Sequence, residues 1–136
     1  MRSDYKIYDP GGVYTITSTI VEWIPIFTSK PYFEILINSM QFCQTQKNLK
    51  IYAYVILLLE FYKKKHKRDS QYQLWQEGFH PQQIMSDDMF RQKVKYIHYN
   101  PVKRGYVESP EYWYYSSAGD FLLNRSGIIQ LDPVPL

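Results

Sequence analysis

The sequence SDDMFRQKVKYIHYNPVKRG, residues 86–105, constrains the fold more than any other stretch. It predicts an amphipathic helix, because apolar side chains recur at intervals of three and four residues. These are Phe90, Val94, Ile97 and His98. Ser86 offers a capping hydroxyl, and the acids at 87 and 88 lie where the helix dipole favours negative charge. The pair at residues 100–101, Asn-Pro, predicts the end of the helix, since a residue before proline disfavours the α conformation.

The flanking segments predict a mixed α+β chain. Residues 9–12, Asp-Pro-Gly-Gly, form a turn signal, and the β-branched run at residues 13–23 predicts a strand. Ser29 is positioned to cap a helix that begins near Pro31, and residues 49–59 predict a second, largely buried strand. The apolar face of that helix is Phe33, Leu36, Ile37 and Met40. Residues 110–121 predict a last helical segment, and the prolines beyond Asn124 predict a peripheral tail at residues 125–136.

Composition and charge exclude some classes of protein and favour others. A chain of 136 residues is sized for one domain, and one cysteine, Cys43, excludes a disulfide framework and predicts a reducing, cytoplasmic setting. No apolar run is long enough to span a membrane, so we expect no membrane partner. Residues 47–104 hold twelve of the sixteen Lys and Arg residues but five of the thirteen acids. Aromatic residues make up 18% of the chain, and basic residues interleaved with aromatic ones favour a nucleic-acid partner.

Residues 96–105, YIHYNPVKRG, followed by YSSA at residues 115–118, resemble the signature of the REP-associated tyrosine transposases, relatives of the single-tyrosine HUH transposases. Trp75-Gln76 and the later Ser-Asp-Asp at residues 86–88 are similar to the family's segment before that helix. The resemblance covers about residues 8–122. It implies a ferredoxin-like (RRM-like) antiparallel sheet with helices on one face. It also implies cleavage of single-stranded DNA by a tyrosine, with Mg²⁺ or Mn²⁺ held by a His-hydrophobe-His pair.

The residues that the family's chemistry requires are missing from this sequence. The His pair is expected just after residue 57, where the chain reads LLEFY, and an internal deletion near residues 57–60 would explain that junction and the loss of one strand. Phe79 occupies the position expected of the nucleophilic tyrosine, and its ring has no oxygen to attack phosphorus. Gln82 falls where a third metal ligand would lie, and a single amide makes at most a weak relic of a site. We therefore expect no bound cofactor and no catalytic residue.

Several side chains remain candidates for DNA contact. Each candidate also has a purely structural interpretation. This is a solvated helix face for the basic residues at positions 63–68, a structural turn for residues 103–104 and a core position for the tryptophan at position 75. The candidates are Lys63, Lys64, Lys65, Lys67, Arg68, Trp75, Lys103 and Arg104. His98, on the apolar helix face, is predicted to be a hydrogen-bonded structural residue rather than a metal ligand.

The sequence thus predicts a domain over residues 1–124 that binds single-stranded or hairpin DNA without cutting it. Three alternatives stay open. The first is an active enzyme that uses a different tyrosine, such as Tyr72, Tyr96 or Tyr99. The second is a non-catalytic module that binds RNA or single-stranded DNA. The third is a decayed gene product, in which a lost interior strand would favour strand exchange in a homodimer.

Overall fold

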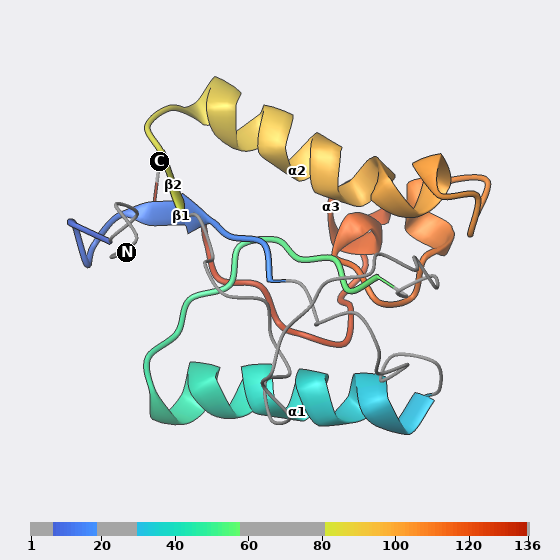
Figure 1. The fold of residues 1–136 in the computed structure, drawn as a ribbon, viewed down its shortest axis with the longest axis horizontal. Coiled ribbons are helices and arrows are strands. Elements are labelled where there is room, and N and C mark those ends of the chain that lie inside the picture. Colours follow the sequence, from blue (N-terminus) through green and yellow to red (C-terminus); the bar gives the residue numbers. More distant parts are fainter. Residues whose placement is uncertain (1–6, 19–29, 58–80, 136) are drawn as a thin grey trace, which may run out of the picture.

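A computed structural model describes residues 7–18, 30–57 and 81–135 of the chain. The described part is a mixed α+β fold with three α-helices, one 3-10 helix and a two-stranded antiparallel sheet (Figure 1). The elements in chain order are β1 (Val13–Thr15), α1 (Lys30–Gln46), β2 (Gln82–Ile84), α2 (Asp87–Lys103), the 3-10 helix η2 (Pro110–Tyr112) and α3 (Ala118–Leu123). The predicted α+β class is confirmed. Residues 110–121, predicted as one helical segment, are divided between η2 and α3.

The sheet is small because β1 and β2 each contain three residues. Val13 pairs with Ile84 and Thr15 with Gln82, so the two buried side chains of the sheet lie opposite each other. The predicted turn before β1 is confirmed, since the Gly12 amide donates to the Asp9 carbonyl over 3.0 Å. Of the strand predicted at residues 13–23, the structure assigns only β1, and residues 19–23 lie outside the described ranges.

Helix α1 follows the predicted apolar spacing. Phe33 and Ile37 are buried, and Leu36 and Met40 pack against the same core cluster. Residues four apart lie on one helix face, so this pattern places one side of α1 against the protein interior. Its predicted cap, Ser29, lies outside the described residues.

Helix α2 begins as predicted and ends later than predicted. The Ser86 hydroxyl accepts a hydrogen bond from the Met89 amide over 3.2 Å, which satisfies a free donor of the first turn. Pro101 does not stop the helix, because it is buried in the last turn, where losing one amide donor breaks a single hydrogen bond. The end is set by Gly105, whose φ of 77° lets the next amide, that of Tyr106, donate to the Pro101 carbonyl over 2.9 Å.

Residues 51–57 are buried or half-buried as predicted, whereas Leu49 and Lys50 are exposed, and the prediction of a strand is wrong for the described residues 49–57. The segment makes one isolated bridge, between Val55 and Ser116, instead of a ladder. Its backbone groups bind irregularly spaced partners in the C-terminal part of the chain. The Ile56 amide donates to the Tyr115 carbonyl over 2.8 Å, and the Ile51 amide donates to a carboxylate oxygen of Asp132, also over 2.8 Å. The Asp132 carboxylate therefore accepts the hydrogen bond that a backbone carbonyl of a neighbouring strand would accept in a sheet.

The C-terminal tail belongs to the core, so the prediction that it is peripheral is also wrong. Ile129 has no exposed surface and packs in the same cluster as Phe33 and Ile37. Polar contacts hold the tail against α1, since the Gln41 amide donates to the Ile128 carbonyl over 3.0 Å. Two prolines do not keep the tail away from the interior, because the residues between Asn124 and those prolines include large apolar side chains.

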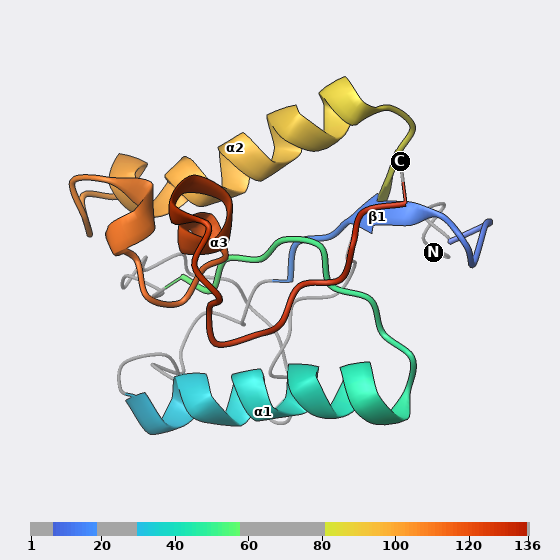
Figure 2. The ribbon, with the colours of Figure 1, turned by 180° about the vertical axis from the view of Figure 1, so that it is seen from behind.

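Two core clusters lie on opposite sides of residues 51–56. Ile51, Tyr54 and Ile56 pack toward α1, whereas Tyr52 and Ala53 pack toward the cluster formed by β1, β2 and α2. Figures 1 and 2 show this extended segment and the tail running between α1 and α2. We expected helices on one face of a sheet; in the described part of the chain the two long helices lie on two sides of extended chain.

A buried hydrogen-bond cluster joins these layers at Ser117. The Tyr54 amide donates to the Ser117 hydroxyl over 2.9 Å, and that hydroxyl donates to the Tyr54 carbonyl over 3.2 Å. His98 Nε2 lies 2.7 Å from the same hydroxyl oxygen. Either atom can donate in this contact, depending on which nitrogen of the neutral imidazole carries the proton. The prediction that His98 is a hydrogen-bonded structural residue is confirmed.

Burial keeps His98 neutral, and this makes stability depend on pH. Desolvation lowers the pKa of His98 to about 4, against the opposing influence of Asp120. In the unfolded chain the same group titrates near 6.5. As the pH falls from about 6.5 to about 4, the unfolded state therefore takes up a proton that the folded state refuses.

We predict that the free energy of unfolding falls by on the order of 2–3 kcal/mol across this window because of His98. Urea denaturation between pH 7.5 and pH 4 measures it. The variant His98→Gln keeps a side-chain N–H donor but cannot titrate, so its unfolding free energy should depend less steeply on pH. Equal pH dependence in the two proteins would show that His98 is not the titrating group.

Removing the buried side chain of the tail should destabilise the whole fold. We predict that Ile129→Ala lowers the free energy of unfolding by about 2–5 kcal/mol, because it leaves a cavity in the α1 cluster. The matched control is Ile35→Ala, which shortens a side chain that is 63% exposed on α1 and should change stability by less than about 0.5 kcal/mol. Similar small effects in both variants would contradict the packing of the tail.

Candidate nucleic-acid interface

The solvent-facing side of α2 carries a row of aromatic and basic side chains. Tyr96, Tyr99 and Lys103 follow one another at intervals of three and four residues, and Lys95 lies beside them. Side chains at this spacing share one helix face. The tyrosine rings are 58% and 41% exposed, respectively, while the opposite face of α2 is buried. We call Lys95, Tyr96, Tyr99 and Lys103 the α2 stripe.

Positive charge is in excess along the α2 stripe. Between Asp88 and Glu108 the sequence has five Lys and Arg residues and no acid. Arg91 is partly neutralised by Asp87 at 3.6 Å, so the unbalanced positive charge lies toward the C-terminal end of α2. There the Lys103 ammonium lies 5.0 Å from the centroid of the Tyr96 ring. The ammonium lies over one face of the ring in a cation–π contact, which holds a phosphate-binding charge against an exposed aromatic side chain.

Lys103 and Arg104, both predicted as DNA contacts, are exposed at this end of α2. The turn at Gly105 ends the helix directly behind them and fixes the direction in which the chain leaves. No described acidic side chain is paired with either residue. Of the predicted contacts, these two are the ones that the structure places.

The other predicted binding residues lie outside the described part of the chain. These are Lys63, Lys64, Lys65, Lys67, Arg68 and Trp75, together with Phe79 and Tyr72. Tyr96 and Tyr99, predicted only as alternative nucleophiles, lie in this exposed row, a placement that the sequence prediction did not include. Their spacing with Lys103 was the signal that could have identified it.

Gln82, the predicted relic of a metal ligand, lies in β2, where it pairs with Thr15. It has an exposed position at the start of that strand. It precedes the N-terminal end of α2, whereas Lys103 lies at the C-terminal end, roughly 25 Å away along a helix of this length. In residues 7–18, 30–57 and 81–135, no group of three His, Cys, Asp or Glu side chains is placed to hold a metal ion.

The segment after α2 extends the exposed aromatic surface. Tyr112 in η2 and Tyr114 beyond it are 68% and 64% exposed. Trp113, between them, turns inward and donates from its indole nitrogen to the Ile56 carbonyl over 2.9 Å. Its ring also packs 5.4 Å from that of Tyr106, centroid to centroid. Alternate side chains thus anchor the segment and leave two tyrosines exposed to solvent.

A membrane-spanning helix is absent from the part of the chain that the structure describes, where every helix is too short or too polar.

Comparisons with known proteins give one partial similarity. No protein-family profile matches the chain, and no solved structure matches it. A Haemophilus influenzae protein named as a REP-associated tyrosine transposase is 46% identical to this chain over 44 residues. Those residues are 32% of this chain and about a quarter, 25%, of the length of that relative. This similarity supports a relationship to that transposase family for the matched third of the chain.

Proposed function

We propose that this chain is a transposase-family protein that binds single-stranded or hairpin DNA and does not cut it. The observation that carries the proposal is the α2 stripe, whose basic and aromatic side chains lie on one exposed face without a neighbouring acid between Asp88 and Glu108. The partial similarity to a REP-associated tyrosine transposase supports the choice of DNA as the partner. The loss of a strand near residues 57–60 is part of the same proposal.

Single-stranded DNA matches both chemical features of the α2 stripe. Its phosphates are bound by exposed cations with release of counterions, and its unpaired bases stack on aromatic faces. Lys95, Lys103 and Arg104 supply the charge, and Tyr96 and Tyr99 supply ring surface. Duplex DNA hides its base faces, so an exposed tyrosine adds little to duplex binding.

The absence of cleavage is proposed from the sequence. Phe79 stands where the family's nucleophile is expected and cannot form a phosphotyrosine. The chain also lacks the His-hydrophobe-His pair that would hold Mg²⁺ or Mn²⁺. Without a nucleophile or a metal to stabilise the phosphoryl charge, the phosphodiester stays intact.

Binding should depend on salt and on the basic end of α2. For a fluorescein-labelled hairpin with a single-stranded tail, measured by anisotropy, the double variant Lys103→Ala with Arg104→Ala removes two phosphate contacts. We predict that it weakens binding and reduces the slope of log affinity against log salt by about 1.4. The control Lys47→Ala removes an exposed lysine beyond the C-terminal end of α1 and should leave affinity and slope unchanged.

Two outcomes would overturn this assignment. The first is salt-insensitive binding, or no binding, at micromolar protein. The second is stronger competition by RNA than by DNA of the same sequence, which would make the chain an RNA-binding module.

We predict no covalent protein–DNA product. Labelled single strands are incubated with the protein and Mg²⁺ or Mn²⁺ and resolved on a denaturing gel, where a phosphotyrosine link would appear as a slower band. A slower band would contradict the proposal. The variants Tyr72→Phe, Tyr96→Phe and Tyr99→Phe would then identify the nucleophile, because removing the attacking oxygen abolishes the band.

A further inference from the structure

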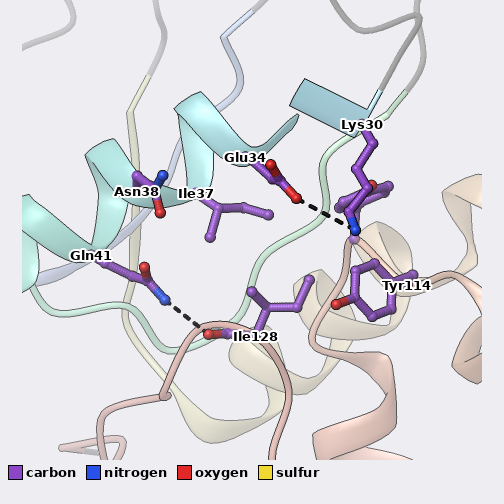
Figure 3. A pocket seen from close by; sticks show the side chains of 8 residues that line it. Lys30, Glu34, Ile37, Asn38, Gln41, Tyr114 and Ile128 are labelled. Carbon is purple, nitrogen blue, oxygen red and sulfur yellow. Dashed lines mark hydrogen bonds and ion pairs between the residues drawn. The ribbon is translucent and has the colours of Figure 1, made fainter. Parts of the chain in front are cut away.

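A groove of about 260 Å³ lies between α1 and the C-terminal part of the chain. Figure 3 shows the side chains of Ile37 and Ile128 lining the groove and the Tyr114 ring at one side. Polar side chains of α1, including Asn38, lie around the rim. Of the eight lining residues, four are polar and four are aliphatic or aromatic, and the volume is that of a small subsite with room for one planar heterocycle rather than of a full ligand pocket.

The tyrosine wall of the groove is fixed by the core. The Tyr115 ring stacks on Phe33 with centroids 3.9 Å apart. Tyr114 meets Tyr115 edge-on at 5.1 Å, and its ring remains 64% exposed. The groove therefore offers an aromatic surface whose neighbour is anchored in the interior, as base stacking requires.

The rim of the groove is rich in hydrogen-bond acceptors. The Gln41 amide nitrogen is engaged with the Ile128 carbonyl, which leaves the amide oxygen as acceptor. Glu34 adds a carboxylate, and its pairing with Lys30 at 3.6 Å balances the charge at the mouth of the groove. The Asn38 side chain, exposed in the lining of the groove, makes no hydrogen bond to any residue that the structure describes, so its amide oxygen and nitrogen are both available for pairing.

The groove lies at the same end of the molecule as the basic end of α2. Figures 1 and 2 both show the N-terminal end of α1 and the C-terminal end of α2 on one side, with the chain after α2 running between them. Tyr112 and Tyr114 are exposed along that segment. A single strand that leaves Lys103 and Arg104 can thus follow exposed rings toward Lys30.

We propose that the groove is a subsite for one unpaired base of the bound strand, selective for a base with an exocyclic amino group and best suited to adenine. This inference rests on the proposed function, since the α2 stripe would supply the rest of the binding. The Asn38 amide can pair with adenine through its N6 and N7 atoms, and the Glu34 carboxylate can accept the second N6 proton. Thymine would turn a carbonyl oxygen toward Glu34, leaving two acceptors opposed. Lys30 would contact an adjacent phosphate.

The test compares two oligonucleotides that differ at one base. We measure anisotropy with labelled dT12 and with the same strand carrying one central dA. The strand with dA should bind at least about fivefold more tightly, the lower bound for a bidentate amide–adenine pair. In Asn38→Ala the preference should disappear while affinity for dT12 is kept. Gln46→Ala removes an exposed amide at the far end of α1 and should retain the full preference.

The design separates failure of the subsite from failure of the proposed function. The double variant Lys103→Ala with Arg104→Ala should weaken binding of both strands and leave their ratio unchanged. Equal affinity of wild type for both strands, or a preference that survives in Asn38→Ala, would overturn the subsite and leave DNA binding intact. If neither strand binds, the proposed function fails, and NMR with dAMP and TMP decides the groove separately. Shifts of the Asn38 side-chain amide with dAMP but not with TMP would support the subsite, and their absence would overturn it.

Discussion

The hydroxyl of Ser117 connects three parts of the chain that are distant in sequence. It binds the backbone of Tyr54 twice and is hydrogen-bonded to His98 Nε2, and Ser117 itself is fully buried. This hydroxyl is costly to replace, because removing it leaves the Tyr54 amide and His98 Nε2 without these partners in the interior, whereas the Tyr54 carbonyl keeps the Ser117 amide as a donor. This contact also sets the position of α2, since His98 lies on its inner face and the α2 stripe lies on its outer face. The proposed binding surface therefore depends on a hydrogen bond in the interior.

Features decided within a few residues could be predicted from the sequence. The Ser86 cap, the turn at Gly12 and the apolar spacing of α1 depend on local hydrogen bonding and helical periodicity, and the structure has all three. The end of α2 was predicted wrongly although it is also local. The rule that proline ends a helix ignores burial, and Pro101 is accommodated in the last turn while Gly105 provides the actual stop.

Features that depend on distant partners could not be predicted in this way. The apolar pattern of residues 51–57 indicated burial correctly, but whether such a segment joins a ladder depends on what lies beside it. Here the neighbours are Ser117 and Asp132, whose side-chain oxygens interrupt the pairing. The candidate site also has a part that depends on local sequence and a part that depends on distant segments. Lys103 and Arg104 were found from a local motif, whereas the groove beside Asn38 is assembled from α1 and the tail, and no sequence spacing reports it.

Tyr115 gives the groove a rigid aromatic side, which the high exposure of the adjacent Tyr114 would not suggest. Its carbonyl accepts the Ile56 amide while its ring stacks on Phe33, so both its backbone and its side chain are held by the core. The wall that Tyr114 presents is consequently organised before any ligand arrives. A ligand entering such a site loses its own freedom but little of the protein's, so more of the contact energy remains as affinity. Residence time should then be governed by the fit of the ligand rather than by reorganisation of the loop.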